Sequence, residues 1–259
     1  MSTTRKIAHN TIVQITGKIF STFLGLLAIG MMTRYLGREQ FGWYVTAITF
    51  LQFVGILIDF GLIPVTAQML SEPHFDKKEL LKNLLGFRFF SALVFLCLAP
   101  LVALLFPYPI EVKIAISFTS LSFLAIAMNQ VLVVYYQHKL SMHMQVVGEV
   151  AGRIFLIAGL WFVTTKGYGF LPVMLAVTLS SLVYTAVLWI HVYQKEKAGF
   201  SFSIPIWKAI MVKMWPIAVS IIFNVVYLKG DTIILSLFWP QETVGIYGAA
   251  YRVIDILAQ

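Results

Sequence analysis

Apolar stretches long enough to cross a bilayer follow one another along almost the whole chain. Four runs carry no charged residue, namely 40–58, 89–110, 114–138 and 167–194, and three others are interrupted only by sparse charges, namely 12–33, 140–165 and 213–237. A spanning helix needs about 20 mostly apolar residues. The pattern therefore predicts seven helices, near 12–34, 41–70, 84–106, 113–137, 144–165, 168–192 and 213–237, with an eighth opening near 244. Strands of a membrane barrel are disfavoured, because they are about ten residues long and alternate strictly.

The composition agrees with a membrane protein. Hydrophobic residues make up 59% of the 259 residues and charged residues only 12%, with a mean hydropathy of +0.86. A soluble domain carries about a quarter of its residues as charged side chains, so a soluble globule and a disordered chain are excluded. The single cysteine, Cys97, excludes an internal disulfide and a multi-cysteine metal site. Because the sequence has no HExxH, paired-histidine or GxxxxGK[ST] pattern, we predict no catalytic residue, no metal and no cofactor.

The basic residues predict the orientation. With the N-terminus in the cytoplasm, twelve lysines and arginines fall in cytoplasmic segments and five in outer loops, which is a positive-inside bias. The outer loops are then expected at 35–41, 107–112 and 165–168. The net charge of +8 indicates cationic loops beside anionic membrane lipids, or a cavity for an anionic substrate, rather than a nucleic-acid partner. We expect a multi-pass protein of a bacterial inner (plasma) membrane.

One segment near the C-terminal end mixes charge with tryptophan. Residues 199–215 hold Trp207, Lys208, Lys213 and Trp215 among apolar residues, which is typical of a helix lying at the membrane interface. We expect 1–198 to form an N-terminal lobe of six spanning helices, and 199–259 to hold the interfacial helix, the seventh span and the start of the eighth.

A short internal repeat indicates how these parts are related. REQFGWYVTA at 38–47 and QETVGIYGAA at 241–250 share glutamate, glycine, tyrosine and alanine at a constant offset of 203 residues. A repeat displaced by six spans keeps its orientation, which gives two parallel lobes related by an axis along the membrane normal. Two such lobes need about twelve spans. We therefore expect an all-α polytopic membrane protein with a two-lobe helical bundle, of which the chain is a fragment: it starts at the natural N-terminus and stops early in the second lobe.

Three stretches carry a family resemblance: MMTRYLGREQFGWY at 31–44, LIDFGL at 57–62, and KGDTIILSLFWPQETVGIYGAAYRVIDIL at 229–257. They resemble polysaccharide (O-antigen) flippases of the Wzx type, in the multidrug/oligosaccharidyl-lipid/polysaccharide exporter superfamily. The resemblance implies a MATE-like fold of twelve to fourteen spans. It also implies transport of a lipid-linked oligosaccharide, on a polyprenyl diphosphate carrier, from the cytoplasmic to the outer leaflet, with polysaccharide polymerases and glycosyltransferases as candidate partners.

Basic residues inside spans are the candidates for substrate contact, because a charge in hydrocarbon is costly unless it faces protein or water. Lys18 lies beside a stripe of small residues, Gly17, Ser21 and Gly25. It either faces a cavity or snorkels to the inner headgroups. Arg88 and Arg252 are further cavity candidates.

Glu149 and Arg153 lie at i, i+4 in one span, the spacing of an intrahelical ion pair. Gly148 and Gly152 flank them as a GxxxG motif, which favours close approach of another helix. The two charges either form a structural pair, or Glu149 holds Arg153 until an anionic headgroup displaces it.

Three aspartates could titrate in a proton-coupled cycle: Asp59, Asp231 and Asp255. Acids near helix ends are more often caps or ion-pair partners, and both interpretations stay open.

Three classes of function are compatible with a multi-pass membrane chain. A flippase for an anionic lipid-linked oligosaccharide, working by alternating access, agrees best with the basic span residues. A multidrug or cation antiporter of the same superfamily would favour acids in the cavity. A membrane-embedded glycan polymerase or acyltransferase would need catalytic groups in sizeable loops or a histidine in mid-span, so we expect the protein not to be an enzyme.

Overall fold

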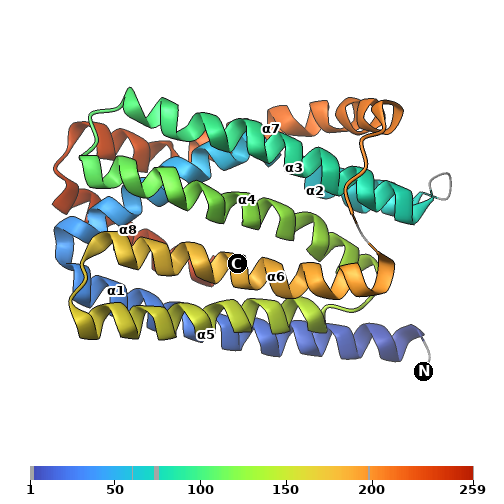
Figure 1. Ribbon diagram of the computed structural model, residues 1–259, viewed down its shortest axis with the longest axis horizontal. Coiled ribbons are helices and arrows are strands. Elements are labelled where there is room, and N and C mark those ends of the chain that lie inside the picture. The colour runs from blue at the N-terminus through green and yellow to red at the C-terminus, as the bar shows by residue number, and fades with distance from the viewer. Residues whose placement is uncertain (1–2, 60, 73–75, 198, 259) are drawn as a thin grey trace.

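The computed structural model describes residues 3–59, 61–72, 76–197 and 199–258, and its described residues form helices with no strand among them. The elements are α1 (Thr3–Asp59), α2 (Leu62–Ser71), α3 (Lys77–Leu104), α4 (Ile110–His138), α5 (His143–Lys166), α6 (Phe170–Glu196), α7 (Ile204–Phe238) and α8 (Gln241–Ala258). They form an elongated bundle whose long helices run roughly along one axis (Figure 1). Six helices of the described part are long and apolar enough to cross a membrane. The fold is thus that of an all-α, multi-pass membrane protein, as predicted.

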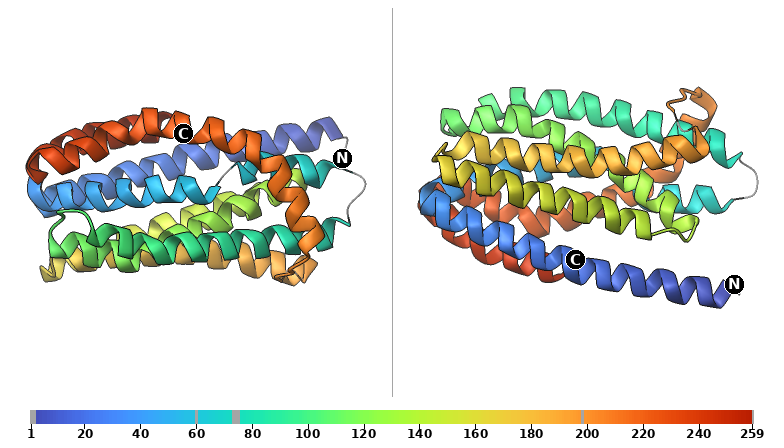
Figure 2. Two further views of the ribbon diagram at one scale, coloured as in Figure 1. Left: turned by 90° about the horizontal axis from the view of Figure 1, so that it is seen from above. Right: turned by 60° about the horizontal axis from the view of Figure 1, so that its bottom comes forward.

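Helix α1 is in fact two antiparallel helices joined at Gly37. Gly37 has φ 65° and ψ −172°, outside the helical region, and glycine adopts such a conformation without steric cost. Figure 2 shows the chain reversing here, so that the two halves of α1 run in opposite directions. The predicted first span and the start of the second correspond to these halves.

The predicted second span, 41–70, is not continuous. Helix α1 ends at Asp59 and α2 begins at Leu62, with Gly61 between them in the left-handed region at φ 77°. A Cβ on Gly61 would also lie 2.6 Å from Cγ2 of Ile217 in α7. The glycine therefore breaks the helix and lets α7 pack closely, which an apolar run by itself does not reveal.

The helices α3, α4, α5 and α6 follow the next four predicted spans to within a few residues at most ends. The reversal at Gly37 and the α3–α4, α5–α6 and α7–α8 connections all lie at one end of the bundle, and the N-terminus lies toward the other (Figure 1). This is the alternation that the predicted topology requires. We call the two ends the Gly37 end and the N-terminal end.

Helix α7 joins two elements that were predicted as separate. The interfacial helix at 199–215 and the span at 213–237 form one helix, Ile204–Phe238, with Pro216 inside it. Figure 2 shows the first turns running across the N-terminal end of the bundle and the remainder turning to run along it. Proline lacks an N–H and bends a helix without always ending it, so the change of direction needs no break.

Small residues set the positions of the first, fifth and sixth spans. A Cβ on Gly17 would lie within 3.0 Å of Val146 in α5, and Ser21, in the same stripe, is 1% exposed. A Cβ on Gly152 would lie 2.9 Å from the carbonyl oxygen of Ser180 in α6. The predicted small-residue stripe and GxxxG motif are therefore helix contacts, and they bring both α1 and α6 close against α5.

The predicted topology can be checked with exposed positions at the two ends. Thr165, at the Gly37 end, and Gln137, at the N-terminal end, are both exposed. In a Cys97→Ser background, Thr165→Cys should react with a membrane-impermeant maleimide in intact cells, and Gln137→Cys only after permeabilisation, because the orientation predicted from the positive-inside rule would place the N-terminal end in the cytoplasm. Labelling of both positions from one side would contradict the alternating topology.

Candidate functional site

A cavity of about 390 Å³ lies among the first, fifth, sixth and eighth helices. Both halves of α1 contribute to its wall, with α4, α5, α6 and α8. The polar residues in its lining are Tyr44, Glu149, Arg153, Ser180, Ser181, Tyr184 and Arg252. Three of the five predicted substrate-contact residues, Glu149, Arg153 and Arg252, thus meet around one space although they are up to 103 positions apart in the sequence.

Arg153 reaches the cavity from α5 and lies against the first span. Its guanidinium carbon would be 3.6 Å from a Cβ placed on Gly25. That separation is ordinary van der Waals contact, so the guanidinium lies directly beside the α1 backbone at Gly25. Arg153 thus meets the first span at the small-residue stripe.

Arg252 enters the same cavity from α8. Its guanidinium carbon lies 5.4 Å from the ring centroid of Tyr44, within the range of a cation–π interaction. Its Nη2 is buried and has no hydrogen-bond partner among the described residues. A buried donor without a partner costs about 1–3 kcal/mol, and an anionic ligand in the cavity would supply the missing acceptor.

The expected ion pair between Glu149 and Arg153 is not formed. Glu149 instead accepts a hydrogen bond from Ser21 Oγ of α1 at 2.6 Å, and none of the ion pairs of the described part joins Glu149 to Arg153. The i, i+4 spacing permits an ion pair between Glu149 and Arg153. However, the close packing of α1 on α5 places the Ser21 hydroxyl within hydrogen-bonding distance of the Glu149 carboxylate. Arg153 is left to face the cavity.

Lys18 lines an adjoining hollow of about 410 Å³ between α1 and α5. Gln14, Gln145 and Glu149 line it too, and Glu149 also lines the cavity. Lys18 lies between the N-terminus and Gly25 on the same helix, so this hollow is nearer the N-terminal end. Lys18, Glu149 and Arg153 therefore follow one another along the α1–α5 contact toward the cavity.

Arg88 was predicted to face the cavity, and the structure places it elsewhere. It is 1% exposed between α3 and α4, where Nε donates to the carbonyl oxygen of Ala127 at 3.1 Å and Nη2 donates to Oε1 of Gln130. Its neighbours one turn away on α3, Leu84 and Ala92, are fully buried. That apolar stripe at i±4 is the sequence signal for a core position rather than a cavity.

A substitution at Arg88 should therefore act on stability. We expect Arg88→Met to destabilise the folded protein by about 1.5–3 kcal/mol, the usual contribution of hydrogen bonds to a charged group, because the buried carbonyl oxygen of Ala127 would lose this donor. The measurement is the thermal unfolding midpoint in detergent, with Arg153→Met as the matched control that should keep its midpoint. A stable Arg88→Met protein with normal folding but no transport would assign Arg88 to the substrate path instead.

Of the three aspartates named as ion-coupling candidates, the structure describes the side chain of Asp231. Asp231 is exposed and accepts hydrogen bonds from the Tyr247 hydroxyl of α8 and from the Thr232 backbone N–H at 2.6 Å. It connects α7 to α8. The side chains of Asp59 and Asp255 lie outside those that the structure describes.

The two copies of the internal repeat pack directly on one another, which the sequence did not indicate. A Cβ on Gly42 would overlap the carbonyl oxygen of Gln241, and a Cβ on Gly245 would overlap that of Arg38. Gly42 aligns with Gly245, and Arg38 with Gln241, at the offset of 203. The contact is therefore symmetric. The glycine of each copy packs on the backbone of the equivalent residue in the other copy, as in two segments related by a local two-fold axis.

Side chains extend this contact at the Gly37 end. Arg38 Nη1 lies 3.1 Å from Glu242 Oε1, and Thr46 Oγ1 donates to Gln241 Oε1 at 2.8 Å. Glycines at the crossing let the two backbones approach closely. The second half of α1 and α8 therefore close the space between them at the Gly37 end of the cavity.

Among the described residues, no group of three or more His, Cys, Asp or Glu side chains could hold a metal ion.

The comparisons with known proteins give one result. A family model described as polysaccharide biosynthesis protein matches residues 7–259, which is nearly the whole chain, and the chain belongs to that family. No curated protein and no solved structure matches it.

Proposed function

We propose that this member of the polysaccharide biosynthesis protein family is a flippase of the Wzx type, which moves a polyprenyl-diphosphate-linked oligosaccharide from the cytoplasmic to the outer leaflet. The observation that carries the proposal is the buried, unpartnered Nη2 of Arg252 in a cavity that Arg153 shares. Two guanidinium groups facing one space match the paired phosphates of a diphosphate, because each can bind a phosphate in bidentate geometry.

The size of the cavity supports binding of the headgroup rather than of the whole substrate. A volume of about 390 Å³ is within the usual range for small-molecule pockets, about 300–1,000 Å³. In the proposal the diphosphate and the first sugars occupy the cavity, while the prenyl tail stays in the surrounding lipid. Ser180, Ser181 and Tyr184 line the same space and offer hydroxyl groups to the sugar.

The positions of the charged residues also support entry of the substrate from the N-terminal end of the bundle. Lys18 lies in the hollow nearer the N-terminal end, and Glu149 lines both spaces. A diphosphate that enters from the cytoplasm would meet Lys18 first and then pass to Arg153 and Arg252. Glu149 is already bonded to Ser21, so it adds little competition for the guanidinium groups.

Transport then requires the opposite end to open. The contact of the second half of α1 with α8 closes the Gly37 end, and in this proposal the two lobes rock apart there by alternating access. An anionic headgroup that moves outward from the negative inside of the membrane moves down the electrical gradient and gains about 2.3 kcal/mol per charge per 100 mV. The membrane potential could therefore supply part of the driving force.

A cation antiporter is less favoured by the lining. Glu149 is the cavity's one acidic side chain among the described residues, against two arginines, and it is occupied by Ser21. A cationic substrate would face net repulsion in this space.

The test is a deletion of the gene that encodes this chain, complemented by the wild-type protein. A flippase defect should leave lipid-linked oligosaccharide on the cytoplasmic leaflet, shielded from an impermeant glycan-modifying reagent, with surface polysaccharide lost. If the lipid-linked precursor were instead absent in the deletion strain, the protein would act in synthesis and the flippase proposal would be wrong.

A further inference from the structure

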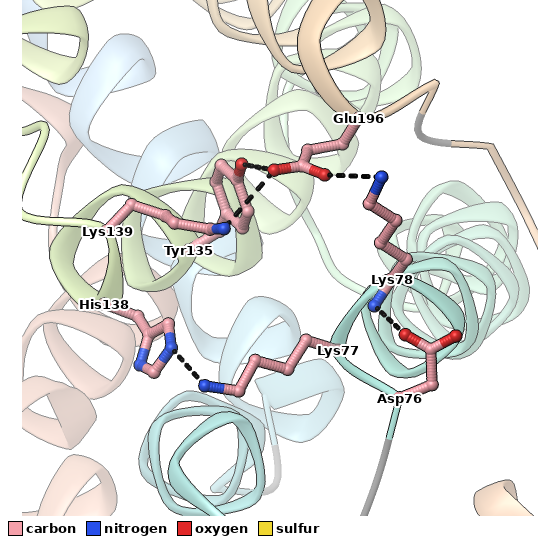
Figure 3. Close-up of polar contacts among 7 residues, drawn as sticks. All are labelled: Asp76, Lys77, Lys78, Tyr135, His138, Lys139 and Glu196. Atoms are coloured by element: carbon pink, nitrogen blue, oxygen red, sulfur yellow. Dashed lines mark hydrogen bonds and ion pairs between the residues drawn. The ribbon is translucent and has the colours of Figure 1, made fainter.

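A second polar cluster, separate from the cavity, lies at the N-terminal end of the bundle. It surrounds a hollow of about 390 Å³ where the start of α3 meets the ends of α4 and α6. Figure 3 shows its members: Asp76, Lys77, Lys78, Tyr135, His138, Lys139 and Glu196. None of them lines the candidate substrate cavity.

Glu196 balances only part of the positive charge. Its Oε1 accepts a hydrogen bond from the Tyr135 hydroxyl at 2.8 Å and lies 3.4 Å from Lys139 Nζ, while its Oε2 lies 3.6 Å from Lys78 Nζ (Figure 3). One carboxylate is therefore shared between two lysines and a phenol. Both lysines keep exposed side chains, at 67% for Lys78 and 47% for Lys139.

Lys77 has no acidic partner among the described residues. Its Nζ lies 3.2 Å from His138 Nε2, and the nearby carboxylate of Asp76 is taken up by the Lys78 backbone N–H at 3.0 Å (Figure 3). An ammonium donating to a neutral imidazole keeps its full positive charge and two further donors. The hollow therefore has three lysines around it and only two carboxylates, one of which caps α3.

We propose that this hollow is a binding site for a phosphate group, held by Lys77 and Lys139 with His138 and Lys78 at its edge. Basic pockets between spanning helices on the cytoplasmic side bind lipid headgroups, and the positive-inside orientation places this end at the cytoplasmic surface. Either an anionic phospholipid headgroup or soluble inorganic phosphate supplies the same chemistry. The site is independent of the proposed transport function.

The test measures binding of each phosphate source to the purified protein. Native mass spectrometry with phosphatidylglycerol, and calorimetric titration with sodium phosphate, are the two probes, and phosphatidylcholine is the zwitterionic reference. The double variant Lys77→Gln with Lys139→Gln should lose about 25-fold in affinity for the probe that binds, since each lysine near an anionic headgroup contributes about fivefold. The matched control, Lys113→Gln with Lys166→Gln, removes the same charge at the Gly37 end and should bind as the wild type does.

A further variant, which should raise the affinity for phosphate, distinguishes loss of the site from a folding defect. Glu196→Gln removes the carboxylate that competes for Lys78 and Lys139, and should raise the affinity several-fold. Preferential binding of phosphatidylglycerol identifies a lipid site, and binding of phosphate alone identifies a soluble ligand; both support the proposal. It is overturned if neither probe binds, if the lysine double variant binds as tightly as its control, or if Glu196→Gln weakens binding.

Discussion

Arg252→Met should reduce transport by about ten- to hundredfold while leaving the thermal stability of the protein unchanged or slightly raised. Hydrogen bonds to a charged group contribute about 1.5–3 kcal/mol, and in our proposal the guanidinium makes them only with the substrate. In the empty protein the buried Nη2 has no partner among the described residues, so its removal relieves a desolvation cost that offsets the lost contact with Tyr44. The measurement combines flipping of lipid-linked oligosaccharide with the unfolding midpoint of the same purified variant.

Matched variants separate substrate binding from a general effect of charge. Arg153→Met should lose transport in the same way, because Arg153 shares the cavity. Arg252→Lys should restore only part of the activity, since an ammonium lacks the bidentate geometry of a guanidinium. Arg34→Gln removes a positive charge at an exposed position outside the cavity lining and should transport normally. Equal losses of stability and transport in Arg252→Met would give the residue a structural role.

Cross-linking the two copies of the repeat should abolish transport, reversibly. A Cβ on Gly248 would lie 2.9 Å from Cβ of Val45, so a small adjustment brings a cysteine pair to the disulfide separation of about 3.5–4.5 Å. In a Cys97→Ser background, oxidation of the Val45→Cys, Gly248→Cys variant should hold the Gly37 end closed. Transport should return on reduction, because alternating access requires this end to open.

The control for this experiment is a pair inside the first lobe. A Cβ on Gly17 would lie 3.0 Å from Cβ of Val146, nearly the same separation, and both residues belong to the predicted N-terminal lobe. The Gly17→Cys, Val146→Cys variant should therefore transport normally when oxidised. Full transport with the Val45–Gly248 disulfide formed would show that the lobes do not separate at this contact.

The spanning helices are the part of this fold that hydrophobicity alone predicts. A run of about 20 apolar residues must be helical in a bilayer, because every backbone polar group has to be paired within its own segment. The spans that became α3, α4, α5 and α6 could for this reason be placed from hydrophobicity alone. The break at Gly61 could not, because a single glycine in an apolar run is compatible with a continuous helix until α7 packs against it.

The partners of the charged residues could not be predicted from the local sequence pattern. The spacing of Glu149 and Arg153 predicts a pair, yet α1 supplies Ser21 to the carboxylate. Arg88 has the same chemistry as Arg153, yet it bonds to α4 in the core. A charged side chain takes the partner that the packing brings nearest, and that partner comes from a helix distant in the sequence.

The sequence by itself therefore determined the membrane-spanning helices, the small-residue faces along which they meet, and the presence of a repeat, since each of these depends on hydrophobicity, residue size or identity at short range. Only the tertiary structure decided that Arg153 and Arg252 face one cavity, that the two copies of the repeat close its Gly37 end, and that Lys77 and Lys139 share a hollow with Glu196. These features depend on which helix faces lie opposite each other, and that is settled by close packing among segments up to about 200 residues apart.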